Sequence, residues 1–150
     1  MPTVFECHGH LHGDPGAAWA VLADFGAIAS WVAQIDHSNL LSEQATGVGA
    51  VRRAQLGRTV LTEHVTEWTD GQVLAYEIRG LPPVLASATA RWSLDRHADH
   101  TDVTVTVTVE AANPAGRAAM PLLRRRLSRS YLDMIDDLAA ATTPAAESTP

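Results

Sequence analysis

The sequence contains no lysine, so all 11 of its cationic side chains are arginines. Without a lysine amine, the chain cannot form a Schiff base with a carbonyl substrate. Its single cysteine, Cys7, excludes both an internal disulfide and a metal cage built from several thiolates. These two shortages remove lysine-dependent covalent catalysis and disulfide-stapled architectures from consideration.

Long apolar runs and a basic surface are lacking too. No run approaches the roughly 20 apolar residues that span a bilayer, and no basic region followed by an apolar stretch marks the N-terminus. We therefore predict a cytoplasmic protein with no membrane span. The net charge of −6 predicts no nucleic-acid partner, because phosphate binding requires a basic face. A basic cluster over 124–129 is interpreted as a solvated helix face, with an anion-binding patch as the alternative.

What is present is the composition of a globular domain. The 150 residues are 46% hydrophobic and 19% charged, and a chain of this length can bury a core. We expect one domain over residues 1–141. The remaining residues, 142–150, are small, polar and contain proline, which predicts a disordered tail.

The N-terminal third predicts a strand and two short helices. The segment Thr3–His12 alternates in polarity, with Phe5 and Leu11 on one face and histidines on the other. Asp14 suits the N-cap, and Pro15 the first position, of a helix that runs to about residue 23. A second short helix is expected over 26–32.

The rest of the chain predicts six strands and a long helix. Period-two alternation is clearest in Thr101–Val109, where valines face in and threonines face out. The helix expected over 115–140 carries an apolar stripe. The six predicted strands are 37–42, 50–56, 59–68, 72–80, 86–94 and 101–109. The stripe consists of Leu123, Leu127, Tyr131, Met134 and Leu138.

This element order predicts an α+β fold. Short turns between six consecutive strands require an antiparallel meander, and the long helix must bury its apolar stripe against one face of that sheet. We expect a curled seven-stranded antiparallel sheet around the C-terminal helix. The space between them is a natural ligand pocket.

Several motifs follow one another in a familiar order and spacing. They are Leu11-His12-Gly13-Asp14-Pro15, Gly47-Val48-Gly49-Ala50-Val51-Arg52, Thr62-Glu63-His64-Val65-Thr66-Glu67-Trp68, Leu74-Ala75-Tyr76 and Thr101-Asp102-Val103. Together they resemble the START-like helix-grip superfamily (SRPBCC), in particular its bacterial polyketide cyclase/dehydrase and lipid-transport branch. The resemblance covers about residues 3–140. It implies a cavity between sheet and helix that holds an apolar or amphipathic small molecule.

Arg52 is the first candidate for chemistry. It shares a strand face with Ala54 and Leu56, so we expect it to point into the pocket. There it can bind a ligand carboxylate, phenolate or enolate through forked hydrogen bonds. The alternative is an arginine at the cavity mouth that pairs with Glu63 or another acid.

Glu63 and Tyr76 are the other two candidates. Alternation alone does not decide which face of its strand Glu63 occupies, and the resemblance favours the inward one. A carboxylate in a dry pocket can act as a general acid or base, or it can form a structural pair with an arginine. Tyr76 lies on the apolar face of its strand and either donates a hydrogen bond to a ligand carbonyl or packs as a core aromatic.

The remaining pocket residues are expected to supply an apolar wall. In the plant abscisic-acid receptors, which share the resembled fold, a cavity lysine aligns with Val32. Ser130 is expected near the pocket rim. Arg91 should point outward unless a bulge shifts its strand. The predicted ligand-binding residues are Trp31, Val32, Ala54, Leu56, Leu61, Ile78, Val107, Leu127, Tyr131 and Met134.

A metal site and a cofactor are not expected. His8, His10 and His12 have the spacing of zinc-binding strand histidines, but they lie opposite the apolar face of their strand and so in water. The glycine turn at 47–49 lacks the third glycine and the following helix of a dinucleotide fingerprint.

Three functions are therefore compatible with the sequence. The chain either binds a small hydrophobic or aromatic molecule, polyketide- or lipid-like, or it cyclises a poly-β-keto chain by aldol closure and dehydration. In the second case Arg52, Glu63 and Tyr76 would stabilise the oxyanion, move protons and orient a carbonyl. The third is a protein-interaction module that uses the arginine cluster and the 81–83 loop. A monomer and a homodimer are both compatible.

Overall fold

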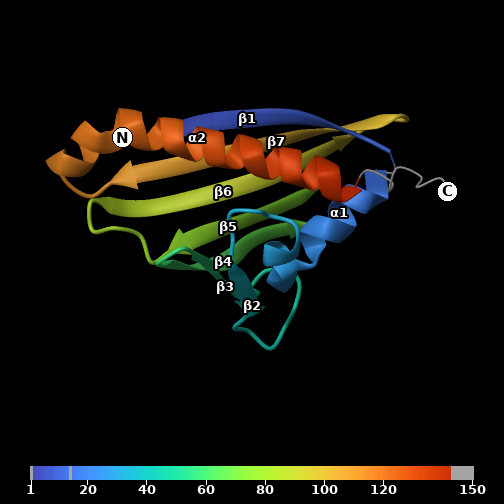
Figure 1. The fold of residues 1–150 in the computed structure, drawn as a ribbon, viewed down its shortest axis with the longest axis horizontal. Coiled ribbons are helices and arrows are strands. Elements are labelled where there is room, and N and C mark those ends of the chain that lie inside the picture. The colour runs from blue at the N-terminus through green and yellow to red at the C-terminus, as the bar shows by residue number, and fades with distance from the viewer. Residues whose placement is uncertain (1, 14, 143–150) are drawn as a thin grey trace.

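The computed structural model describes residues 2–13 and 15–142 (Figure 1). The predicted order of one strand, two short helices, six strands and a long helix is confirmed. The elements are β1 (Thr3–His12), α1 (Pro15–Ala23), the 3₁₀ helix η1 (Phe25–Ser30), β2 (His37–Leu40), β3 (Val51–Leu56), β4 (Thr59–Thr69), β5 (Val73–Arg79), β6 (Leu85–Arg96), β7 (His100–Ala111) and α2 (Pro114–Thr142).

The seven strands form one antiparallel sheet in the order β1-β7-β6-β5-β4-β3-β2. Strands β2 to β7 follow one another as a meander, and β1 joins the far edge beside β7, with Thr3 opposite Val109 and His12 opposite His100. The long helix α2 lies along one face of this sheet (Figure 1). The molecule therefore has the α+β helix-grip fold that the sequence predicts.

The core lies between the sheet and α2. The inward valines of β7 are almost completely buried, as the alternation predicts. On α2, Tyr131, Met134 and Leu138 are buried as expected, whereas Leu127 is only half-buried. Ile135, which the predicted stripe omits, is also buried. Burial of this apolar face holds the helix on the sheet.

Gly9 sets how closely α2 approaches β1. A Cβ atom at this position would lie 2.4 Å from Cγ2 of Ile135, well inside van der Waals contact. A glycine within a strand commonly marks such a close approach. Because Gly9 has no side chain, Ile135 can pack directly against β1 and is part of the core.

Two bulges change faces that simple alternation assigns. The register shifts between Val65 and Glu67, so Trp68 turns to the core side, whereas strict alternation would put it on the same face as His64. A second shift between Leu85 and Ser87 leaves Ala86 exposed, although strict alternation groups it with the inward Ala88 and Ala90.

The predicted element ends need small corrections. The segment expected as a helix over 26–32 is the 3₁₀ helix, and β2 stops two residues before residue 42. α2 starts at Pro114, where Oδ1 of Asn113 accepts a hydrogen bond from the Gly116 amide at 2.8 Å, the geometry of an N-cap. Thr142, expected in the tail, is the last helical residue, and its hydroxyl donates to the Leu138 carbonyl.

Two expectations fall outside the described residues. They are the N-cap role of Asp14 and the disorder of residues 143–150. Within the described part of the chain, no helix combines the length and the hydropathy that crossing a membrane requires.

Candidate functional site

A small internal cavity lies between the sheet and α2. Its volume is about 100 Å³. The wall is mostly apolar, and polar atoms come from a few residues on β4, β5, α2 and the loop after η1. The lining residues are Ile28, Gln34, Ile35, Ala54, Leu56, Leu61, Glu63, Tyr76, Ile78, Leu127, Ser130, Tyr131 and Met134.

An ion pair between neighbouring strands stands at this cavity. Arg52 on β3 is directly opposite Glu63 on β4, and the arginine Nε donates a hydrogen bond to Oε1 of Glu63 at 2.6 Å. Both side chains are at least nine-tenths buried. Alternation along β3 places Arg52 inward together with Ala54. Glu63 reaches the cavity wall, and the guanidinium neutralises its charge from behind that wall.

The guanidinium of Arg52 is held on its other sides as well. Its Nη1 donates to the Phe25 carbonyl at 3.0 Å. Its central carbon lies 3.9 Å from the ring centroid of Phe25 and 4.9 Å from that of Tyr76, which are cation–π distances. A planar, weakly hydrated guanidinium suits such a stacked and buried position. Arg52 is therefore a fixed part of the wall's support.

Two tyrosines add hydroxyl groups to the cavity wall. The hydroxyl oxygens of Tyr76 on β5 and Tyr131 on α2 are 3.4 Å apart. Nε1 of Trp92 donates to the Tyr76 oxygen at 3.3 Å. The side chains of Tyr76, Trp92 and Tyr131 thus connect β5, β6 and α2 through polar contacts inside an otherwise apolar core.

Burial keeps both tyrosines protonated. Burial away from water, and to a lesser extent the negative charge of nearby Glu63, raises the pKa of Tyr76 to about 12. Burial also raises the pKa of Tyr131 well above its ordinary value, and the neighbouring Tyr76 acts in the same direction. At neutral pH each hydroxyl is therefore a hydrogen-bond donor facing the cavity.

A seam of hydrogen bonds ties the loop after η1 to α2. Oγ of Ser130 donates to Oε1 of Gln34 at 2.9 Å, and Nε2 of Gln34 donates to the Ser130 carbonyl at 3.3 Å. Further along, the Ala33 amide donates to Oδ2 of Asp137 at 3.0 Å. We call these four residues the loop–helix seam. It closes the cavity beside the half-buried Leu127.

The structure brings most of the sequence-predicted wall residues together. Those that line the cavity are Ala54, Leu56, Leu61, Ile78, Leu127, Tyr131 and Met134. Trp31, Val32 and Val107 lie outside the lining: Val32 and Val107 are buried elsewhere in the core, and Trp31 packs edge-on against Trp92. Gln34 and Ile35 were missed because they follow η1 in a segment without periodicity.

The remaining candidates point away from the cavity. Arg91 is half-exposed and pairs with Glu67, its Nε lying 2.9 Å from the glutamate Oε1, because the β6 bulge lies several residues before it. His8, His10 and His12 lie on the exposed face of β1, as expected. Among the described residues, the chemistry-bearing groups at the cavity therefore come from the ion pair, the tyrosines and the seam.

Comparison with known protein families gives one match. The model of the family described as polyketide cyclase/dehydrase and lipid transport matches residues 8–143. The chain belongs to this family. No curated protein matches the sequence significantly.

Several solved structures share the fold of this chain. The Zhui aromatase/cyclase from a Streptomyces species is 17% identical, with a TM-score of 0.76 over 98% of this chain and 99% of that one. Ginseng major latex-like protein 151 is 12% identical, with a TM-score of 0.73 over 95% and 99%. The di-domain ARO/CYC StfQ of the steffimycin biosynthetic pathway is 14% identical, with a TM-score of 0.78 over 95% of this chain and 51% of StfQ.

The cavity of this family member is small. Pockets that enclose drug-sized ligands usually measure roughly 300–1,000 Å³, whereas this cavity measures about 100 Å³. An engineered apolar cavity of roughly 150 Å³ is enough for benzene. A larger molecule therefore enters only if the seam or the half-buried leucines move.

Proposed function

We propose that the protein binds a small hydrophobic or aromatic molecule, polyketide- or lipid-like, in the cavity between the sheet and α2. The observation that carries this proposal is an apolar cavity into which one carboxylate and two protonated tyrosines project. Membership of the polyketide cyclase/dehydrase and lipid-transport family supports it.

The polar groups favour a ligand that carries a carbonyl or a phenol. The Tyr76 and Tyr131 hydroxyls can donate to a carbonyl oxygen, and the Glu63 carboxylate can accept from a phenolic hydroxyl. Ala54, Leu61 and other apolar wall residues contact the ring or chain. A saturated hydrocarbon would leave the buried polar atoms without new partners, so it should bind more weakly than a phenol of equal size.

Entry of the ligand widens the cavity at the loop–helix seam. The seam crosses between a loop and a helix, and its hydrogen bonds are the polar contacts that a displaced loop exchanges for water. Leu127 is half-buried at the same place and can turn outward. Removing the Ser130 hydroxyl should therefore speed ligand association with little loss of stability.

Native mass spectrometry of the purified protein, repeated after denaturation, is the direct test. A co-purified small molecule that is released on denaturation supports the proposal and gives the ligand class. An empty protein is then titrated with phenols, flavonoids and fatty acids while tryptophan fluorescence is followed. Failure of every class to bind would overturn the proposal and favour the protein-interaction alternative.

A pair of variants on one strand localises the binding. Ala54→Leu fills the cavity, because Ala54 is buried and lines it. Gln55→Leu places the same leucine side chain on the opposite, half-exposed face of β3. We expect the first to weaken binding at least tenfold and the second to leave it unchanged. Equal affinities in both variants would place the ligand elsewhere.

The second candidate function is aldol cyclisation and dehydration of a poly-β-keto chain. It is favoured by the buried Glu63 carboxylate at the cavity wall and by the shared fold of two aromatase/cyclases. In this scheme Glu63 removes a proton from a carbon between two carbonyls. The resulting enolate attacks another carbonyl carbon of the chain, which closes the ring, and the carbonyl oxygen takes a proton from Tyr76 or Tyr131. In the dehydration the protonated Glu63 returns its proton to the new hydroxyl, which leaves as water, while the tyrosinate takes the remaining proton of the attacking carbon and a carbon–carbon double bond forms.

The contacts of Arg52 define its part in that scheme. Its guanidinium binds Glu63 and two ring faces, so it positions the carboxylate, and an enolate would have to displace one of these contacts before Arg52 could stabilise it. Glu63→Gln should abolish turnover while binding of a product analogue persists. Tyr76→Phe should lower kcat more than it raises KM. Full turnover in both variants would exclude the cyclase assignment.

A further inference from the structure

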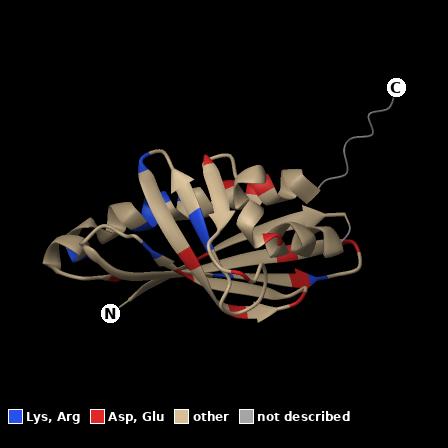
Figure 2. Cartoon of the chain, turned by 90° about the horizontal axis from the view of Figure 1, so that it is seen from below, with Lys and Arg blue, Asp and Glu red and all other residues tan. Residues whose placement is uncertain are grey.

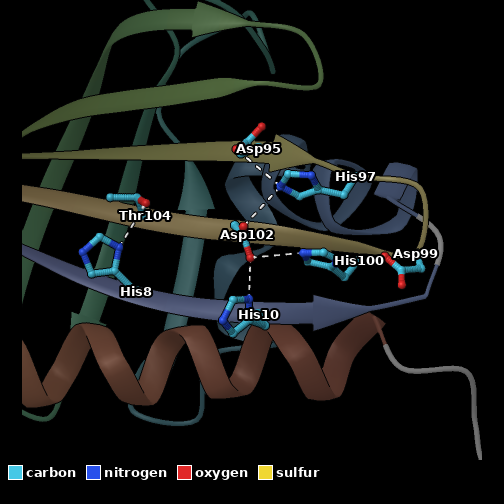
Figure 3. Close-up of polar contacts among 8 residues, drawn as sticks. All are labelled: His8, His10, Asp95, His97, Asp99, His100, Asp102 and Thr104. Atoms are coloured by element: carbon cyan, nitrogen blue, oxygen red, sulfur yellow. Dashed lines mark hydrogen bonds and ion pairs between the residues drawn. The ribbon is translucent and has the colours of Figure 1, made fainter.

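Six titratable side chains gather on the outer face of the sheet, away from the cavity (Figure 3). They lie at the end where β6 turns into β7 and where β1 ends. We call them the histidine–aspartate cluster. Its members are His10, Asp95, His97, Asp99, His100 and Asp102.

Three adjacent strands bring these residues together. In the ladder between β1 and β7, His10 is directly opposite Asp102. In the ladder between β7 and β6, the same Asp102 is directly opposite Asp95. His100 lies two residues from Asp102 on the same face of β7, and His97 follows β6 in the turn. The cluster is therefore fixed by sheet register.

The imidazoles converge on the carboxylate of Asp102. Nδ1 of His10 contacts its Oδ1, and Nε2 of His100 lies 3.6 Å from the same oxygen. Nε2 of His97 lies 3.2 Å from Oδ2. One ligand atom from each of His10, His100 and Asp102 lies within 4.8 Å of the other two.

Asp99 orients His100 for ligation. Nδ1 of His100 donates to Oδ1 of Asp99 at 2.7 Å, which leaves Nε2 as the nitrogen facing Asp102. A carboxylate that holds the far nitrogen of a histidine fixes the tautomer and makes the near nitrogen a better metal ligand. His97 is stacked on His100 with ring centroids 4.5 Å apart, which further limits rotation of the ring.

The cluster holds three carboxylates whose negative charges a bound cation would offset. Asp95 and Asp102 form a directly opposed pair of like charges across two strands, an arrangement that destabilises a sheet. Asp99 adds a third carboxylate beside His100. Within the cluster, positive charge comes only from protonation of the histidines. A bound divalent ion would neutralise the carboxylates at neutral pH.

We propose that the histidine–aspartate cluster binds a divalent transition-metal ion of the zinc type, with His10 Nδ1, His100 Nε2 and a carboxylate oxygen of Asp102 as ligands. Two imidazoles and one carboxylate are a donor set that zinc accepts, and a fourth position is open to water. Nε2 of His97 lies 3.2 Å from the other oxygen of Asp102 and 3.4 Å from Oδ2 of Asp95, so His97 bridges the two carboxylates and helps to hold Asp102 in place. Mg²⁺ and Ca²⁺ prefer sites built from oxygen atoms alone.

The ligands differ from those that the sequence suggests. The two-residue spacing on β1 groups His8, His10 and His12, yet the structure joins only His10 to the cluster. His8 lies beside Thr104, with its Nδ1 3.2 Å from the threonine hydroxyl. The other ligands come from β7, roughly 90 residues further along the chain, and their approach depends on sheet pairing.

Calorimetric titration of the tag-free protein with zinc chloride near neutral pH tests the site. We expect one ion per chain, a rise in Tm on binding, and no comparable effect of magnesium chloride. His100→Ala and Asp102→Asn should each abolish zinc binding at this site. Asp99→Asn, which removes only the orienting carboxylate, should weaken binding by about 10- to 100-fold.

His8→Ala is the matched control, because His8 is exposed on the same face of the same strand but faces a threonine. It should bind zinc as the unaltered protein does. Absence of binding, persistence of binding in His100→Ala and Asp102→Asn, or an equal loss in His8→Ala would each overturn the proposal. Circular dichroism of every variant separates loss of a ligand from loss of the fold.

Discussion

At the residue scale, Arg52 and Glu63 remove two opposite charges from water, and each depends on the other. Replacing one member of a buried ion pair leaves an uncompensated buried charge, which typically costs about 3–5 kcal/mol. We expect Arg52→Met to lower the free energy of unfolding by about that amount, measured by urea denaturation at neutral pH. The paired variant Arg52→Met/Glu63→Gln should recover part of the loss.

The Arg91–Glu67 pair is the control for this prediction. Both of its side chains are about half-exposed, and exposed ion pairs contribute about 0–1 kcal/mol. Arg91→Met should therefore change stability little. If Arg52→Met and Arg91→Met lowered the free energy of unfolding equally, burial would not be what makes the Arg52–Glu63 pair important for stability.

The two tyrosines predict an alkaline transition. The pKa of Tyr76 is about 12 in the folded protein against 10 for an ordinary tyrosine. Below pH 10 both states keep the proton, so stability does not depend on this group. Between pH 10 and 12 only the unfolded chain releases it, so stability falls by about 1.4 kcal/mol per pH unit for each such tyrosine.

Ultraviolet absorbance of tyrosinate measures this transition directly, because the chain has two tyrosines and both are buried. The folded protein should show almost no tyrosinate at pH 10.5, whereas the chain in urea should titrate near pH 10. Half of the tyrosine signal appearing near pH 10 in the folded state would show that one ring reaches water.

Thr101 predicts a stabilising substitution. Its hydroxyl oxygen is buried on the inner face of β7 and has no hydrogen-bond partner among the described residues. A buried polar group without a partner costs roughly 1–3 kcal/mol. Thr101→Val keeps the shape and removes that cost, so the free energy of unfolding should rise by about 1 kcal/mol. A fall in the urea midpoint would show that the hydroxyl has a partner.

The sequence predicted the site residues in part. Alternation placed Arg52 and Tyr76 on inward faces, and both are buried. It could not show that the Arg52 guanidinium stacks on Phe25, because that contact joins segments separated by a turn and a strand. Nor could it find Gln34, whose position depends on the hydrogen bonds to Ser130. Ligand binding by these residues stays a prediction.

At the element scale, the packing of α2 on β1 depends on the missing side chain of Gly9. A Cβ there would overlap Ile135. We expect Gly9→Ala to cost about 1–3 kcal/mol by overpacking. In an Ile135→Ala background the same change should cost much less, because the opposing methyl group is gone. A double-mutant cycle by urea denaturation measures this coupling, and additive losses would contradict it.

Element order and element type were predictable because the polarity pattern was strong. The valines and threonines of β7 show period two without interruption, and that strand was predicted almost to its ends. Strict alternation fails at Trp68 and Ala86 because of bulges, which add one residue to a strand and invert the faces beyond it. Nothing local in the sequence marks these two bulges, since neither contains glycine.

At the scale of the whole molecule, charge is unevenly spread. On α2 the arginines occupy the N-terminal part and the aspartates the C-terminal part (Figure 2). The net charge is −6 at pH 7, and seven histidines can add enough positive charge to cancel it in mild acid. The sequence isoelectric point is about 5.5. Solubility should therefore be lowest near that pH and recover on either side of it.

Electrophoretic mobility against pH measures this behaviour, and the mobility should change sign near the isoelectric point. The same measurement with added zinc tests the histidine–aspartate cluster, because a bound zinc ion adds positive charge and would move the sign change of the mobility toward higher pH. A sign change more than one pH unit away without zinc would show that several carboxylates or histidines titrate far from their ordinary values.

The pairing of β1 with β7 has a consequence for synthesis of the chain. β1 leaves the ribosome first, but its partner is made roughly 90 residues later. At about 5–20 residues per second, translation of that stretch takes on the order of 10 s. Throughout that time Phe5, Cys7 and Leu11 have no sheet to cover them, whereas each hairpin from β2 to β7 can close soon after it emerges. The nascent N-terminal strand is thus the segment that a chaperone would have longest to bind.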